Sequence, residues 1–479
     1  MSAPRAEGAV RSDGKGRPPH PGLVLAVACL CQTMVVLDLT VVNVALPSIR
    51  SDLGFDANGL QWVVNAYNLT FGGLLLLGGR LADLAGPRRA AVLGLGLFGL
   101  TSLLGGLARG PGELVAARAV QGVSGALLLP VGLTVITTTF AEGPARHRAL
   151  AVWGAVAGAG GAAGVLLGGM LTEYLNWRWT LFVNVPIVVV VIPLAVACLS
   201  DPRPPRRRRL DVTGAVLVTA AMTVLVYTMV RTDVHAWGSP HTLGGFVLAA
   251  LLACAFVAVE RRAAVPLVRL SVLRTRSLSV AALITFLISG SQFGAFYFVS
   301  LYLQGVLGYS PVGTGLAFVP FSIGVVSATV VAHRVLPRFG PRPPLIAGLM
   351  LAAAGMTWLS AIGPHGGYLA DFLGPSLLTA AGIGLCMVTT AAVGIADVAP
   401  EEAGLASGLL NSARQCGGSI GLAVLVTAAT ATIHQQADPA TSAALTEGYT
   451  RAFLIGGLLM TTAALIAATL LPRRLAPPR

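Results

Sequence analysis

Long apolar runs alternate with short polar segments along almost the whole chain. A helix that crosses a bilayer needs about 20 mostly apolar residues, and windows of that kind predict fourteen spans. Their approximate limits are 23–46, 58–80, 90–108, 112–136, 149–171, 179–200, 211–231, 242–259, 278–304, 313–333, 344–362, 368–395, 404–431 and 449–471. The first run is too long for the apolar region of a signal peptide. The pattern therefore predicts an all-α membrane protein.

The arginines between the spans are unevenly distributed. Cytoplasmic loops carry an excess of Lys and Arg. If the N-terminus is cytoplasmic, most basic residues fall on the cytoplasmic side, including the run Arg206–Arg209. The residues on the opposite side are Arg50, Arg109, Arg178, Arg231 and Arg451. This bias predicts a multi-pass protein of the cell (plasma or inner) membrane with both termini in the cytoplasm.

The composition is that of a membrane protein and argues against some classes of partner. Hydrophobic residues make up 55% of the 479, charged residues 11%, and the mean hydropathy is +0.79, whereas soluble domains carry about 25% charged residues. The net charge of +13 is spread over many loops instead of forming one patch, so we expect no nucleic-acid partner. The six cysteines all lie in apolar runs, which argues against a disulfide framework or a zinc site.

The sequence repeats itself weakly. Gly86-Pro87-Arg88 recurs 254 residues later as Gly340-Pro341-Arg342, and the same offset relates Gly154 to Gly408 and Gly164 to Gly418. Repeats of this kind build transporters around a site at the midplane. We expect a cytoplasmic tail at 1–22, a six-helix bundle at 23–200, two inserted helices with their loops at 201–277, a second six-helix bundle at 278–471 and a cytoplasmic tail at 472–479.

Three charged residues lie well inside predicted spans: Asp38, Arg118 and Arg414. A charge at the bilayer centre costs at least about 2.5–3.5 kcal/mol, so such residues are functional candidates. Desolvation favours the neutral form of a buried carboxylate, and Asp38 is therefore a candidate proton carrier. The alternatives are a permanent ion pair or a carboxylate capped by backbone. The sequence does not say whether Arg118 is its partner.

Two spans carry patterned faces. Arg118, Gln121, Gly122 and Gly125 share one face of a helix, where a fixed cation could modulate a nearby carboxylate. The fifth span carries a glycine stripe that admits a close neighbour, either as static packing or as a sliding surface between bundles. Its members are Gly154, Gly158, Gly160, Gly164 and Gly168.

The loop after the second span combines an acid with several arginines. Gly79, Asp83, Gly86 and Arg88 lie within eleven residues at a helix end. Such a cluster can form a charge clamp between helices that holds one conformational state and is released in the other. The alternative is a simple topology anchor, which leaves Asp83 unexplained.

No catalytic motif occurs in the chain. Walker A, H-E-x-x-H and metal-ligand spacings are missing from the sequence. We therefore expect no enzyme activity, no metal and no cofactor, and without a nucleotide site the energy must come from an ion gradient, such as a proton gradient, or from the substrate's own gradient.

These motifs resemble the major facilitator superfamily, specifically its fourteen-helix drug:proton antiporter branch of EmrB/QacA-like exporters, over roughly residues 23–471. The similarity rests on Asp38–Pro47, on Gly79–Arg89, on Arg118 with Gln121 and Gly122, on Trp177–Pro186, on Gln304–Pro320 and on Gly408–Gly418. In the fifth span, Val165 stands where that branch has proline.

The resemblance implies alternating access between two bundles. It implies proton-coupled efflux of amphipathic drugs or antibiotics, with Asp38 and Arg118 in proton coupling, and we expect a monomer. The candidate lining of the substrate cavity is Asn43, Asn65, Gln121, Gln292 and Tyr297. A proton-coupled importer or facilitator, and a non-transporting membrane sensor, remain alternatives.

Overall fold

The computed structural model describes residues 21–471 except 57, 142, 200–210, 234, 236, 264–273, 399–401, 437 and 440. The N-terminal helices are α1 (Pro21–Leu53), α2 (Trp62–Ala85), α3 (Pro87–Gly106), α4 (Pro111–Thr139), α5 (Pro144–Tyr174), α6 (Trp179–Phe182) and α7 (Asn184–Cys198). Then come α8 (Val212–Val230), the short η1 (Arg231–Asp233) and α9 (Pro240–Arg262). The C-terminal helices are α10 (Arg276–Gly305), α11 (Pro311–Ala317), α12 (Val319–Phe339), α13 (Arg342–Leu359), η3 (Tyr368–Leu373), α14 (Gly374–Ile395), α15 (Ala403–His434) and α16 (Ser442–Leu470).

Each predicted span corresponds to a helix or to two consecutive helices, which confirms the all-α membrane fold. Within the described residues, eleven helical segments are long and apolar enough to cross a bilayer, and α2, α5 and α13 are not among them. The number of fourteen crossings therefore stays a prediction. The Arg206–Arg209 run, residues 1–20 and residues 472–479 lie outside the described residues.

The repeated Gly-Pro-Arg segment makes the same turn twice. Gly86 ends α2 with φ of 89°, and Gly340 ends α12 with φ of 69°, a backbone region that glycine enters without steric cost. A proline follows each glycine, and proline suits the start of a helix because its missing N–H would have no partner there. The sequence repeat thus marks equivalent corners of the two halves.

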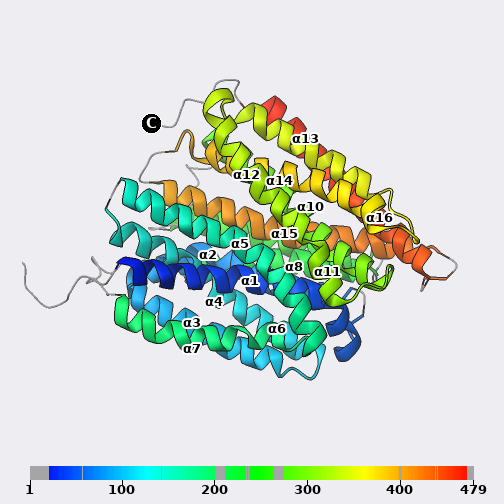
Figure 1. The fold of residues 1–479 in the computed structure, drawn as a ribbon, viewed down its shortest axis with the longest axis horizontal. Coiled ribbons are helices and arrows are strands. Elements are labelled where there is room, and N and C mark those ends of the chain that lie inside the picture. The colour runs from blue at the N-terminus through cyan, green and yellow to red at the C-terminus, as the bar shows by residue number, and fades with distance from the viewer. Residues whose placement is uncertain are drawn as a thin grey trace, which may run out of the picture.

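Helices α1–α7 gather on one side of the molecule and α12–α16 on the other (Figure 1). We call the end at which α1 begins the inner end and the end at which it finishes the outer end. One apolar core at the outer end contains residues of both halves, such as Leu46 and Ile49 with Phe298 and Phe453. Toward the inner end, a second core contains N-terminal residues and a third contains C-terminal ones. Of these three cores, only the one at the outer end contains residues of both halves.

Hydrogen bonds join the two halves at this shared core. Ser300 donates to the backbone oxygen of Asn43 (2.9 Å), and Gln304 donates to that of Val44 (2.9 Å). Glu173 on α5 accepts from the backbone N–H of Val312 (2.8 Å). These contacts fasten α1 and α5 to α10 and α11.

The inserted helix α8 bridges the halves. It packs against α2 and α15, through an apolar cluster of Leu69, Val226, Val230 and Ala423. Thr427 on α15 donates to the backbone oxygen of Met229 (3.2 Å). The insert thus covers the seam between α2 and α15, and α9 packs on α8.

The glycine stripe of α5 faces α1 over part of its length. A Cβ at Gly164 would meet Thr40 Oγ1, and one at Gly168 would lie 2.6 Å from the backbone oxygen of Val41. At Gly160 the nearest atoms are at ordinary contact distance, 3.6 Å. Gly154 does not take part, because a Cβ there would meet nothing within 4 Å. The surroundings of Gly158 lie outside the described part of the molecule.

We expect Gly168→Val to destabilise the protein and Gly154→Val to leave its stability nearly unchanged. The first substitution forces α5 away from the α1 backbone, and overpacking of this kind costs about 1–3 kcal/mol. The unfolding temperatures of the two purified variants measure the difference. Equal unfolding temperatures would contradict the close α1–α5 contact.

Candidate functional site: a buried ion pair in the N-terminal half

Asp38 and Arg118 meet inside the N-terminal half. Asp38 lies in the middle of α1 and Arg118 in the first half of α4, and Arg118 Nη1 is 2.5 Å from Asp38 Oδ2. The exposed fraction is 0% for Asp38 and 2% for Arg118. The two spans that sequence reasoning singled out thus bring their charges into one buried pair.

The second carboxylate oxygen is held by two amides. Asp38 Oδ1 accepts from Gln121 Nε2 at 2.9 Å and from Asn184 Nδ2 at 3.0 Å. Both amides also donate to the Ser102 hydroxyl, at 2.8 and 3.3 Å. The Asp38 carboxylate is therefore enclosed by donors from α4 and α7, and Ser102 on α3 bonds to both amides.

Arg118 has partners besides Asp38. Its Nε donates to the backbone oxygen of Val63 (3.0 Å) and its Nη1 to Gln121 Oε1 (2.8 Å). The guanidinium carbon lies 4.5 Å from the centre of the Tyr67 ring, a geometry in which the face of an aromatic ring attracts a cation. Arg118 therefore has stabilising contacts that do not involve Asp38.

Sequence reasoning missed three members of this network as site residues: Tyr67, Ser102 and Asn184. Tyr67 is fully buried on α2, and its hydroxyl has no hydrogen-bond partner among the described residues. Of the three, Asn184 was the easiest to find from the sequence, because it is a lone amide at the start of the apolar run of α7. Ser102 carried no signal, since small hydroxyl residues are common in membrane helices.

The predicted cavity residues do not surround one chamber. Asn43 bonds to its own helix at Leu39 (2.8 Å), and Asn65 donates to Gln61 (3.4 Å). Tyr297 is 1% exposed and belongs to the shared apolar core in this structure, so its place in a cavity stays a prediction. Gln121 belongs to the Asp38 network. A sequence shows which residues are polar, but not which face of its helix each one occupies relative to the bundle axis.

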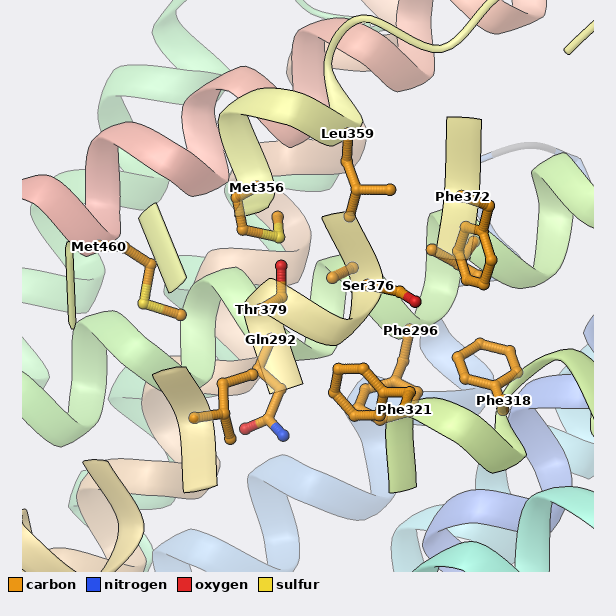
Figure 2. Close-up of a pocket in the computed structure, with 13 residues that line it drawn as sticks. Gln292, Phe296, Phe318, Phe321, Met356, Leu359, Phe372, Ser376, Thr379 and Met460 are labelled. Atoms are coloured by element: carbon orange, nitrogen blue, oxygen red, sulfur yellow. The ribbon is translucent and has the colours of Figure 1, made fainter. Parts of the chain in front are cut away.

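Gln292 lies in a different place, at a pocket inside the C-terminal half. This small pocket is walled by α10, α12, α13, η3, α14 and α16. Figure 2 shows the labelled phenylalanines grouped on one side and the labelled methionines on the other, with Gln292 below the methionines. The labelled aromatic and sulfur side chains are Phe296, Phe318, Phe321, Phe372, Met356 and Met460.

The remaining candidates are dispersed. Arg414 on α15 is exposed, and no hydrogen bond or ion pair joins it to the residues that the structure describes. In the loop motif, Gly79 lies beside Pro130 and Arg88 lies in the first turn of α3. The side chain of Asp83 lies outside the description, so the charge clamp stays a prediction. In the described part of the chain, no group of His, Cys, Asp or Glu is arranged to hold a metal.

Comparison with known proteins decides the family. The family model described as Major Facilitator Superfamily matches residues 28–422. The chain belongs to the Major Facilitator Superfamily. Its fold is similar to a solved structure described as a bacterial homologue of the human lysosomal transporter Spinster, in an inward-facing and unoccupied conformation. The TM-score is 0.69 and the sequence identity 17%, and the alignment covers 96% of this chain and 100% of the other.

Two relatives of this facilitator are named for antibiotic resistance and export. The puromycin resistance protein pur8 of Streptomyces alboniger is 43% identical over 458 residues, which is 93% of this chain and 91% of the relative. The cephamycin export protein CmcT of Amycolatopsis lactamdurans is 46% identical over 413 residues, 84% of each chain. The resemblance to the drug-exporting branch is therefore confirmed, and this chain is a multi-pass membrane protein of a transporter family.

Proposed function

We propose that this facilitator exports small amphipathic organic compounds, antibiotics among them, in exchange for protons. The names of the two relatives supply the class of cargo. The observation that carries proton coupling is the Asp38–Arg118 pair, which is enclosed by hydrogen-bond donors and sealed from water. A carboxylate in such a place can exist in two protonation states, and these differ in how firmly α1 is tied to α4.

The proton acts at a distance from the cargo in this scheme. All described side-chain hydrogen bonds of Asp38 go to residues of α4 and α7, and none of them goes to the C-terminal half. Protonation removes the charge that Arg118 neutralises, which loosens the tie between α1 and α4. Because α1 also contacts α10 and α11 at the outer end, a shift of α1 changes how the two halves meet.

The proposal includes the orientation of the chain in the membrane and the movement of its two bundles. The inner end is cytoplasmic, the chain resides in the cell membrane as a monomer, and the bundles 23–200 and 278–471 rock against each other. The shared outer core then makes this structure a state that is closed to the outside. Protons enter from the outside when the outer end opens, and cargo binds from the inside. No cofactor or catalytic step is required.

Everted membrane vesicles test the proposal with puromycin as the cargo. Their lumen corresponds to the outside of the cell, so an acidic lumen should drive puromycin into vesicles that contain the protein. Collapse of the pH gradient with a protonophore should abolish this accumulation. Puromycin uptake into whole cells that increases with outside acidity would contradict export.

A further inference from the structure

Arg414 is a charge at membrane depth that the proposed proton site does not use. It is the only Asp, Glu, Lys or Arg between Glu402 and Asp438. It lies about 16 Å from the first residue of α15, at 1.5 Å per residue, whereas arginines that snorkel to the membrane surface lie near helix ends. Charges at such depth are rare and mark functional sites.

The Arg414 side chain has no partner in the part of the chain that the structure describes. No hydrogen bond or ion pair joins it to another residue there. It is exposed, whereas the other described residues of α15 from Leu405 to Thr430 are buried or partly buried. Among the described acidic side chains, Asp38 alone lies in the middle of a membrane helix, and Arg118 already neutralises it. Arg414 therefore carries a charge that a negatively charged guest can neutralise.

The face of α15 that carries Arg414 is directed between the two halves. Leu425 lies three turns further along this face and belongs to the outer core that the halves share. On one flank, a Cβ at Gly421 would meet the backbone of α10. On the other flank, Gln415 lies against Gly72 of α2. Arg414 therefore points between α10 of the C-terminal half and α2 of the N-terminal half.

This place opens toward the inner end. Leu425 is in the shared outer core, so Arg414 lies on the inner side of that core, where the two halves have separate cores. Helical side chains lean toward the N-terminus of their helix, which for α15 is the inner end. Gly290 of α10 lies beside Gly421, which places the exposed Leu283 of α10 at the level of Arg414. The guanidinium thus has exposed apolar surface at its own level.

The fold does not need a cation at this position. The repeat offset of 254 residues pairs Arg414 with Gly160 on α5, and α5 packs on α1 as α15 packs on α10. A Cβ at Gly160 would lie at ordinary contact distance, 3.6 Å from Val36 of α1. The N-terminal half therefore forms the equivalent helix pair without a charged side chain, so the cation in the C-terminal half is available for recognition.

We infer that Arg414 binds the carboxylate of an amphipathic cargo in the space between the two halves, reached from the inner end. The occupant is called cargo on the strength of the proposed export function. A guanidinium presents its N–H donors in a planar fork that matches a carboxylate, and hydrogen bonds between charged groups are stronger than neutral ones. A neutral analogue of the same shape loses this contact and binds more weakly.

Modification by phenylglyoxal tests the inference on the purified full-length protein in detergent. Phenylglyoxal is uncharged and reacts with accessible arginine side chains. We expect modification at Arg414 but not at the sealed Arg118, identified by peptide mass spectrometry. Cefoxitin, an amphipathic antibiotic with one carboxylate, should protect Arg414 in a saturable manner, and its uncharged methyl ester should not. Arg338, exposed near the end of α12, should be modified to the same extent with and without cefoxitin.

A second arm separates cargo from lipid as the source of the negative charge. Equal protection of Arg414 by cefoxitin and by its methyl ester would overturn the inference, because the carboxylate would then contribute nothing. Anionic lipids offer a phosphate that a guanidinium also binds, so dioleoylphosphatidylglycerol is tested beside cefoxitin. Protection by this lipid without protection by cefoxitin would overturn the inference and assign Arg414 to a lipid headgroup.

Three variants measure the contribution of the charge. Arg414→Gln should raise the Kd for cefoxitin roughly tenfold in isothermal titration calorimetry, because a charged hydrogen bond is lost, and should leave the Kd for the methyl ester unchanged. Arg414→Lys keeps the charge without the planar fork and should give an intermediate Kd. Arg338→Gln is the matched control and should bind both compounds as the unmodified protein does. The same Kd for cefoxitin in Arg414→Gln and the unmodified protein would overturn the inference.

Neither measurement needs a gradient or transport, which separates the two proposals. If cefoxitin protects Arg414 while everted vesicles accumulate neither puromycin nor cefoxitin, the export function is wrong and carboxylate binding at Arg414 stands. If puromycin accumulates with proton dependence while cefoxitin leaves Arg414 unprotected, carboxylate binding at Arg414 is wrong and export stands.

Discussion

Asp38→Asn is expected to abolish proton-driven export while the protein stays folded and continues to bind cargo. Asparagine is close in shape to aspartate and can still accept from Gln121 and Asn184, but it cannot change its charge. In everted vesicles with an acidic lumen, puromycin accumulation should fall to the level of vesicles without the protein. Exchange of labelled for unlabelled puromycin at equal pH on both sides should persist, because exchange needs no net proton movement.

Asp52→Asn is the matched control for this variant. Asp52 lies on the same helix and also pairs with an arginine, since its Oδ2 is 2.6 Å from Arg178 Nη1, but its side chain is 46% exposed. Exposed pairs contribute little, about 0–1 kcal/mol, so accumulation should remain close to that of the unmodified protein. Undiminished gradient-driven accumulation by Asp38→Asn would contradict the assignment of the proton carrier.

Arg118→Met is expected to cause the largest loss of stability among the substitutions considered for this site. It leaves Asp38 buried without its countercharge, and removal of one partner of a buried pair costs about 3–5 kcal/mol. Thermal unfolding of the detergent-purified variant beside the unmodified protein measures the loss.

The double variant Asp38→Asn/Arg118→Met provides the control. With the carboxylate neutral, removal of the guanidinium leaves no unpaired charge in the network, so the double variant should unfold at a higher temperature than Arg118→Met. Residues in direct contact show non-additive effects of about 0.5–3 kcal/mol. If the double variant lost as much stability as the two single variants together, Asp38 and Arg118 would contribute to stability independently.

The helices were predictable from the sequence because lipid imposes a strong constraint. Every segment that crosses the bilayer must satisfy its backbone internally and present apolar side chains, so long apolar windows coincide with helices. The corners at Gly86 and Gly340 were also predictable, since a glycine followed by proline ends one helix and begins the next. The repeat offset pointed to the equivalence of α1–α4 with α10–α14 before any coordinates were considered.

The contacts within the candidate site were less accessible to sequence reasoning. Charges in apolar spans identified Asp38 and Arg118, but the spacing along a chain does not show that helices distant in sequence bring them together. Asn184 comes from a helix that begins 146 residues after Asp38 and bonds to the same carboxylate. The predicted cavity lining stays a prediction, since in this structure Asn43, Asn65 and Tyr297 contact their own helix, a neighbouring side chain or the shared core. Gln292 lines a pocket, but one enclosed by a single half.

The two halves also show why a repeat does not imply identical roles. Positions that carry Asp38 and Arg118 in one half carry Gln292 and Phe372 in the other. The shared backbone arrangement therefore holds a buried ion pair in one copy and a mostly apolar cluster in the other.

Proton release on cargo binding tests the central claim most directly. Purified protein in weakly buffered detergent solution, with a pH-sensitive dye, should release protons when puromycin is added near neutral pH. The same addition to Asp38→Asn should release none, while Asp52→Asn should behave as the unmodified protein does. Equal proton release from Asp38→Asn and the unmodified protein would show that another group carries the proton.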